Sequence, residues 1–171
     1  MGGGYQPIGA TLCTKEIHDA IRDGTGFFQH GHTYLGHPAA CAAGLAVLER
    51  LVDDDVLGRV NTAGIKLQTA LETRFGQHPH VGDIRGVGLF QGIELVSDRA
   101  SKDPFPHSEK RHATIKAAAF DAGLICYPMG GTIDGKSGDH VLIAPPFIIT
   151  EAQVDELVEK LASALETALP N

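Results

Sequence analysis

Apolar residues along the first third of the chain recur at spacings that predict one strand and two helices. Residues 8–13 form a short, mostly apolar run, which predicts a buried strand. A helix is predicted over residues 15–23, followed by a turn at residues 24–26. Pro38 suits the first position of a second helix, because proline lacks an N–H that the first helical turn leaves unpaired anyway. The apolar positions at helical spacing behind it are Cys41, Leu45, Leu48, Leu51 and Val52.

Two longer helices are predicted farther along the chain. The first has Gly76 as its C-terminal cap, and its inner face consists of Val60, Gly64, Leu67, Leu71 and Phe75. The second begins behind Thr150, whose spacing to Gln153 predicts a capping box in which each side chain binds the backbone of the other residue. Its apolar face consists of Val154, Leu157, Val158, Leu161 and Leu165.

Between these helices the apolar period changes to that of strands. Residues 83–88 predict a turn in which a strand starts, and Ser108 opens a helix that continues to Gly123. The last two strands are joined by a loop at residues 129–138. The predicted strands are residues 89–95, 124–127 and 140–143. Without an internal repeat, this order predicts an α+β domain preceded by a piece of α/β structure.

Composition excludes several classes of function. The chain has 14 Lys and Arg against 21 Asp and Glu, a net charge of −7, which argues against nucleic acid as a partner. No apolar run approaches the ~20 residues that cross a bilayer, and no secretory signal is visible. The three cysteines are scattered and odd in number, which favours reduced thiols and a cytoplasmic location over a disulfide framework.

Two glycine-containing motifs resemble those of a known family. The first is Gly-Gly-Gly-Tyr-Gln-Pro-Ile-Gly-Ala at residues 2–10, and the second is Gly-His-Thr-Tyr-Leu-Gly-His-Pro-Ala-Ala-Cys-Ala at residues 31–42. Together they resemble the class III, or ω-type, pyridoxal-phosphate-dependent aminotransferases. Segments at residues 85–95, 124–128 and 139–147 extend the resemblance over nearly the whole chain.

This resemblance implies a fold and a position within it. The chain would be the C-terminal part, less than half, of an α/β transferase of fold type I. Residues 1–55 would be a remnant of the large cofactor-binding domain, with its last strand and the interdomain helix, and residues 56–171 the small α+β domain. In the family, the lysine that holds the cofactor as a Schiff base precedes a glycine-rich turn like that at residues 2–4. We therefore expect that lysine upstream of this chain and no catalytic residue within it.

Thr33 and His32 are the predicted cofactor-binding residues. A phosphate needs hydroxyl and backbone N–H donors in a tight turn, and glycine with threonine just before a helix can supply both. In the family this threonine reaches across a dimer interface to the phosphate of the partner subunit's pyridoxal phosphate. The resemblance gives that role to Thr33, with the backbone of His32 in support. The alternative is that Thr33 only caps the turn before Pro38.

Three aromatic residues are the predicted substrate-binding residues. Some family members have an arginine near the position of Tyr127, where a guanidinium can bind a substrate carboxylate through two hydrogen bonds. This chain has tyrosine there, which departs from the common way of binding a dicarboxylate or an α-keto acid. Tyr5 and Phe28 would line the entrance of the active site, and a plain packing role fits each of them equally well.

Two other motifs have alternative interpretations that we reject. The histidines His30, His32 and His37 lie close in sequence, but zinc sites usually add a carboxylate or thiolate, and no Asp or Glu is near. We therefore predict no metal site. Residues 86–92 resemble a dinucleotide fingerprint, but their glycines precede a strand, whereas the fingerprint opens a helix.

Two functions from different classes remain. The first is a part of an aminotransferase that moves an amino group between an amine or amino acid and a keto acid, with pyridoxal 5'-phosphate as cofactor and a homodimer as the complete form. The second is a non-catalytic truncated module that acts only in subunit association. On either interpretation we expect no nucleic-acid and no membrane partner.

Overall fold

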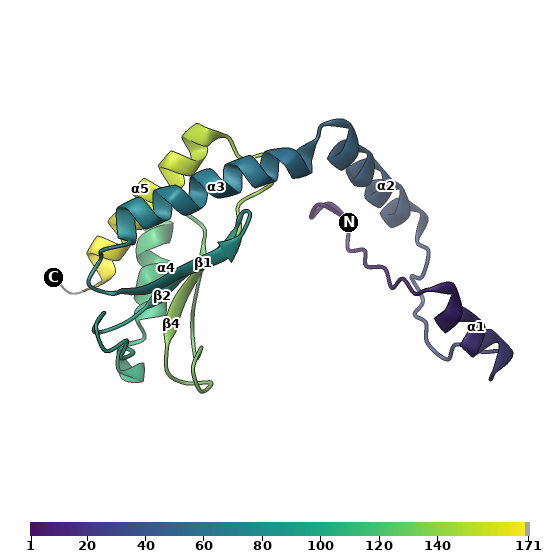
Figure 1. The fold of residues 1–171 in the computed structure, drawn as a ribbon, viewed down its shortest axis with the longest axis horizontal. Helices are drawn as coiled ribbons and strands as arrows, with labels where there is room; N and C mark the ends of the chain where they lie inside the picture. The colour runs from purple at the N-terminus through teal and green to yellow at the C-terminus, as the bar shows by residue number, and fades with distance from the viewer. Residues whose placement is uncertain (170–171) are drawn as a thin grey trace. The chain divides into compact units, whose positions relative to one another are not determined.

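The computed structural model describes residues 1–169, and the chain divides into two compact units between Asp55 and Val56 (Figure 1). Among the described residues, only the second unit encloses a hydrophobic core. No helix within residues 1–169 is both long enough and apolar enough to span a membrane.

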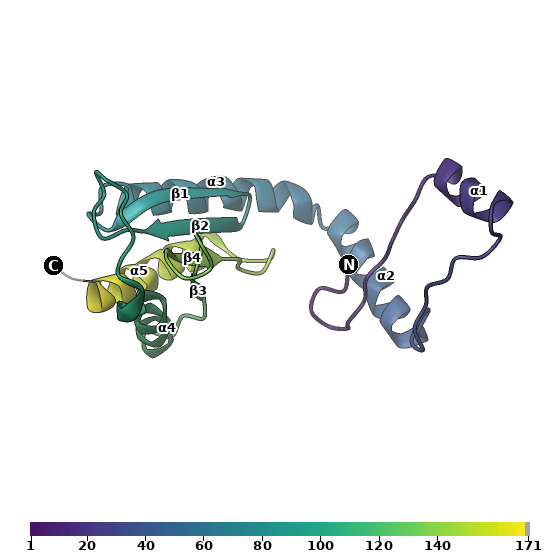
Figure 2. The same ribbon diagram turned by 90° about the horizontal axis from the view of Figure 1, so that it is seen from below.

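The second unit combines helices with a four-stranded antiparallel sheet. Its elements are α3 (Val56–Phe75), β1 (Val81–Val87), β2 (Phe90–Leu95), the 3-10 turn η1 (His107–Glu109), α4 (Arg111–Asp121), β3 (Tyr127–Gly130), β4 (Asp139–Ile143) and α5 (Glu151–Ala168). The strand order β1-β2-β4-β3 puts β1 and β3 at the edges. Helix α3 packs along β1, α4 packs on β3 and β4, and α5 contacts both α3 and α4 (Figure 2).

Alternation along the strands sorts the side chains onto two faces of this sheet. Ile84, Ile93 and Val141 lie side by side on the inner face, where Ile93 and Val141 are fully buried. One row of the outer face consists of Arg85, Gly92, Leu142 and Tyr127. The inner face packs against the helices through Leu67, Leu71, Phe75, Ile115, Leu161 and Leu165. Burying each such side chain stabilises the fold by about 1.5–3 kcal/mol.

The start of α5 confirms the predicted capping box. The Thr150 hydroxyl accepts the backbone N–H of Gln153 at 3.3 Å, and the Gln153 side-chain oxygen accepts the backbone N–H of Thr150 at 2.9 Å. A cap of this kind stabilises a helix by roughly 1 kcal/mol. It fixes where α5 begins, and the helix then buries the predicted apolar face.

Two strand predictions were wrong at their boundaries. Residues 83–87, predicted as part of a turn, belong to β1, and the turn is confined to Gly88 and Leu89, where Gly88 has a φ of 57°. The strand predicted over residues 124–127 begins only at Tyr127. Gly123, with a φ of 77°, ends α4, and the Leu124 N–H binds back to the carbonyl of Ala119 at 2.8 Å. Residue 124 is therefore part of a helix C-cap and cannot join the sheet.

The helix predicted from Ser108 is interrupted. A 3-10 turn covers Ser108, and Lys110 then adopts a left-handed conformation with a φ of 48°. Because a left-handed residue cannot continue a right-handed helix, α4 begins one residue later, at Arg111. The rest of the predicted helix is confirmed as far as Asp121.

The first unit contains the two predicted helices, α1 (Lys15–Asp23) and α2 (Pro38–Asp53). The strand predicted over residues 8–13 was wrong, because this segment is irregular and exposed apart from Ile8. A strand needs a neighbouring strand to pair its N–H and C=O groups, and residues 1–55 contain none. Ile8 instead packs against Gly44 of α2, where an added Cβ would lie 3.1 Å from the Ile8 side chain.

Two backbone carbonyls at the start of the edge strand β1 are bound by side chains. At the start of β1, the guanidinium of Arg99 donates to the Val81 carbonyl at 2.9 Å, and the ammonium of Lys102 donates to the Gly82 carbonyl. Both residues lie in the loop after β2. These two acceptors are therefore already bound within the unit.

The connection between α3 and β1 contains a histidine that is held neutral. The ring Nδ1 of half-buried His78 accepts the backbone N–H of His80 at 3.1 Å. Burial lowers the pKa of His78, and the nearby His80 and Arg74 lower it further. The neutral ring is therefore the form that suits this fold.

We predict that the two units exchange amide hydrogens at different rates. Residues from about 59 onward should exchange slowly, because their strands and helices cover one another, whereas residues 1–55 should exchange quickly and α2 at an intermediate rate. Hydrogen exchange with mass spectrometry on the 171-residue chain measures this. Exchange at residues 8–13 as slow as at Phe90–Leu95, in a monomeric sample, would contradict the prediction.

We predict that His78 makes stability depend on pH. Its pKa in the fold lies below the ordinary value near 6.5, so its contribution is complete above about pH 6.5 and is lost as the pH falls towards the folded-state pKa. His78→Asn keeps an acceptor for the His80 N–H and cannot be protonated. Urea unfolding between about pH 7 and 5 should therefore show a smaller loss of free energy of unfolding for the variant. Equal losses of free energy of unfolding in the variant and the unaltered chain would show that His78 does not contribute to the pH dependence.

Candidate functional site

The segment before α2 is a turn closed by its own backbone. The Leu35 N–H binds the His32 carbonyl at 2.9 Å, and the His37 N–H binds the Tyr34 carbonyl at 3.1 Å. Gly36 supplies the positive φ of 70° that the turn requires. The His37 ring then accepts the Ala40 N–H at 3.4 Å and caps α2, with Pro38 in the first helical position as predicted.

This turn presents His32 and Thr33 to the outside. Both are exposed, and within residues 1–169 the Thr33 hydroxyl and the backbone N–H groups of His32 and Thr33 have no hydrogen-bond partner. Residues 24–48 contain no Asp, Glu, Lys or Arg. A phosphate here would thus meet free hydroxyl and N–H donors without repulsion from a nearby carboxylate of the same segment. The residues present fit a phosphate group.

Phe28 lies near the turn through a chain of ring contacts. Its ring meets His30 edge-on at 5.9 Å between centroids, and His30 meets His32 at 6.3 Å. Phe28 is 63% exposed, so most of its ring is free to contact another molecule. The structure therefore brings Phe28, His32 and Thr33 into one local region.

Tyr5 lies apart from that region. It follows the turn at residues 2–4, in which the Tyr5 N–H binds the Gly2 carbonyl at 2.9 Å, and its side chain is 80% exposed. Gly3 lies against Val47, nine residues beyond the start of α2. At 1.5 Å per residue this is roughly 14 Å along the helix from Pro38. Tyr5 is thus next to the middle of α2, and the turn that contains Thr33 precedes its start.

The histidines of this segment do not gather around a common point. Among the described residues, no three His, Cys, Asp or Glu side chains are placed to hold one metal ion. The ring of His37 is used in capping α2.

Tyr127 belongs to the second unit. It is the first residue of β3, lies on the outer face of the sheet and is 58% exposed. Its row continues through Leu142 and Gly92 to Arg85. The guanidinium of Arg85 binds Glu94 at 2.8 Å and Asp83 at 2.6 Å, so its positive charge is already paired with two carboxylates.

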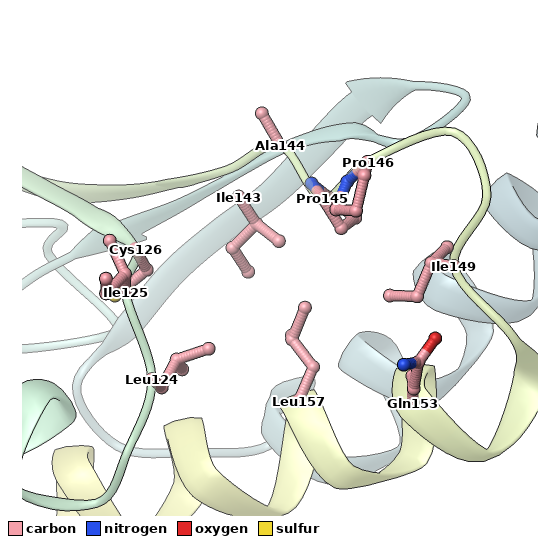
Figure 3. A pocket seen from close by; sticks show the side chains of 10 residues that line it. All are labelled: Leu124, Ile125, Cys126, Ile143, Ala144, Pro145, Pro146, Ile149, Gln153 and Leu157. Carbon is pink, nitrogen blue, oxygen red and sulfur yellow. The ribbon is translucent and has the colours of Figure 1, made fainter. Parts of the chain in front are cut away.

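An apolar hollow of about 300 Å³ beside residues 124–126, just before β3, was missed by the sequence analysis. It lies between the segment that precedes β3, the end of β4 and the first turns of α5 (Figure 3). Its lining includes Leu124, Ile125, Cys126, Ile143, Pro145 and Leu157. Burial raises the pKa of the Cys126 thiol, which favours the neutral form. The feature of the sequence that could have indicated it is the proline pair Pro145 and Pro146, which follows β4 and lines the hollow.

Comparisons with known proteins agree with these motifs. The model of the family described as aminotransferase class-III matches residues 1–165. An uncharacterized aminotransferase of Schizosaccharomyces pombe is 42% identical over 169 residues, which are 99% of this chain and 37% of that protein. The crystal structure of an (S)-enantioselective omega-transaminase from Thermomicrobium roseum is 34% identical, with a TM-score of 0.82 over 92% of this chain and 33% of that chain.

A second solved structure is the PMP-bound form of an aminotransferase from Vibrio fluvialis. It is 33% identical, with a TM-score of 0.78 over 90% of this chain and 32% of that chain. The chain thus spans about a third of the length of the proteins that it matches. The family match covers nearly all of the chain, both units included, and the chain belongs to the class-III aminotransferase family.

Proposed function

We propose that the whole protein transfers an amino group between an amine or amino acid and a keto acid, with pyridoxal 5'-phosphate as cofactor. The family match over residues 1–165 carries this proposal, and the PMP-bound relative supports the choice of cofactor. The cofactor supplies the electron sink that such a transfer needs. The residues of this chain would bind the phosphate of the cofactor and orient the substrate.

The turn before α2 would bind the phosphate of the cofactor. The Thr33 hydroxyl and the backbone N–H of His32 are free donors within residues 1–169. They lie in a segment, residues 24–48, that contains no Asp, Glu, Lys or Arg. In the resemblance that motivates this role, the threonine of one subunit reaches the cofactor of the other. We therefore propose a homodimer as the assembly in which the site is complete.

Tyr127 and the aromatic residues of the first unit would contact the substrate. A tyrosine hydroxyl can give a carboxylate one hydrogen bond, whereas an arginine can give two in parallel. Arg85, in the same row of the sheet, is bound by Asp83 and Glu94. We therefore propose that Tyr127 orients the substrate without acting as a strong carboxylate anchor, and that Phe28 and Tyr5 shield the entrance from water.

Three of the chain's seven lysines are paired with carboxylates, which makes them poorly suited to hold the cofactor covalently. That role needs a neutral amine, yet the hydrogen bond that Lys66 donates to Asp155 raises the pKa of Lys66 and favours its charged form. Lys160 binds Glu156 at 2.7 Å, and Lys15 binds Asp19. We propose that the covalent attachment uses a lysine outside these 171 residues.

The second candidate function is subunit association without catalysis, which one observation favours. The stripe formed by Cys41, Leu45, Leu48 and Val52 along α2 is apolar and exposed. A helix with apolar residues on its outer side as well as its inner side is normally buried. The two candidates differ in whether the chain contributes to cofactor binding, and the two experiments that follow measure this.

We predict that the 171-residue chain does not attach pyridoxal phosphate covalently at a defined lysine. The chain is mixed with the cofactor and reduced with borohydride, and the labelled peptides are identified by mass spectrometry. Weak labelling spread over several exposed lysines is the expected result. Stoichiometric labelling of a single lysine, together with measurable transamination, would show that the chain contains its own attachment site.

We predict that Thr33→Ala in the whole protein weakens cofactor retention and leaves the fold intact. Losing one hydrogen bond to a charged oxygen costs about 1.5–3 kcal/mol, or roughly 10- to 150-fold in affinity. Thr33→Ser keeps the hydroxyl and should retain most of the affinity. Thr25→Ala is the matched control, because Thr25 binds the backbone of Phe27 in the same unit. Unchanged affinity in Thr33→Ala would leave Thr33 as a turn residue, which favours the association function.

A further inference from the structure

Helix α4 begins without a cap from its own sequence. Lys110, the residue before it, is left-handed, and within the described residues its side chain makes no hydrogen bond to the helix. The carboxylate of Asp139 takes this place, because its Oδ1 accepts the backbone N–H of His112 at 3.1 Å. Asp139 is the first residue of β4, so the cap comes from a different element, 27 residues away.

The same oxygen meets the ring of His112. The distance from His112 Nδ1 to Asp139 Oδ1 is 2.5 Å. An ionised carboxylate only accepts hydrogen bonds, so Nδ1 is the nitrogen that carries the hydrogen. Asp139 is 5% exposed. A carboxylate this deeply buried is costly unless it is hydrogen-bonded, and the two donors from His112 meet that need.

Gly130, the last residue of β3, lets the ring lie close. It pairs with Asp139 in the sheet. A Cβ at Gly130 would lie 2.7 Å from His112 Nδ1 and 3.5 Å from Asp139 Oδ1, so only glycine leaves room for the ring against the strand. Gly130, His112 and Asp139 together form what we name the hairpin clasp, because they join α4 to the β3–β4 hairpin.

We propose that the hairpin clasp positions Tyr127. β3 has four residues, and its only strand neighbour within residues 1–169 is β4. Tyr127 is at one end of β3 and the clasp is at the other, roughly 10 Å away at 3.3 Å per residue. A short edge strand held by one ladder takes its direction from whatever fixes its ends. The catalytic consequence rests on the proposed role of Tyr127, whereas the positional statement does not.

Fluorine NMR on the full 171-residue chain tests the positional statement. The chain has three tyrosines, and the other two, Tyr5 and Tyr34, lie in the first unit and serve as internal references. The chain is labelled with 3-fluorotyrosine, and Tyr127→Phe assigns the resonance. His112→Ala should shift or split the Tyr127 resonance and leave the other two in place. An unmoved Tyr127 resonance in folded His112→Ala overturns the proposal.

Two further variants separate positioning from general loss of structure. His112→Asn can place an amide nitrogen where Nδ1 stands, and it should restore the wild-type resonance. His107→Ala is the matched control, because the His107 ring binds the Lys136 carbonyl at 2.7 Å in the loop of the same hairpin without touching the clasp. It should leave Tyr127 unmoved, and a shift equal to that of His112→Ala overturns the proposal. If His112→Ala does not fold, Gly130→Ala replaces it with the same expectation, because its Cβ would lie 2.7 Å from His112 Nδ1 and displace the ring.

Kinetics of the whole protein test the catalytic consequence separately. His112→Ala should lower kcat/KM for the amino substrate by up to about 100-fold, the loss that a misplacement of about 1 Å can cause. His112→Asn should recover most of the activity that His112→Ala loses. A Tyr127 resonance that moves while kcat/KM stays unchanged contradicts the substrate role of Tyr127 and does not affect the positional statement.

Discussion

The apolar inner face of the four-stranded sheet is the constraint on which the second unit depends. Ile84, Ile93 and Val141 form a continuous row across three strands, and such a row must be shielded from water. Helices α3, α4 and α5 provide that shield, and their own apolar faces are buried in the process. The packing of these helices on the sheet follows from this burial.

The first unit is held by local hydrogen bonds and not by a hydrophobic core. Its turn before α2 is defined by backbone hydrogen bonds and a histidine cap, which need no core beneath them. Local geometry can therefore present Thr33 and His32 even though α2 buries little more than Ala40 and Gly44. The donors of this turn are set by sequence-local chemistry. In the function that we propose, other polypeptide supplies the surroundings that make them a binding site.

Local signals in the sequence predicted what local forces decide. Pro38 at the start of α2 and the Thr150–Gln153 box were read correctly because a helix end depends on three or four adjacent residues. The segment at residues 8–13 was read as a strand from its apolar character alone, yet a strand exists only with a partner. The cap that Asp139 provides for α4 joins residues 27 positions apart, and neither residue type nor spacing marks it. The hollow beside residues 124–126 is also a product of packing between distant segments.

The closed start of β1 has a consequence for how this chain behaves at high concentration. An edge strand with free carbonyls is a template onto which another molecule can add a strand, and such addition can continue into fibres. Arg99 and Lys102 occupy two of these carbonyls with cationic side chains, which also repel a like-charged edge. Self-association through the sheet is thereby disfavoured at this end. The exposed apolar stripe of α2 is a second surface through which copies of this chain could associate, by contacts between helices.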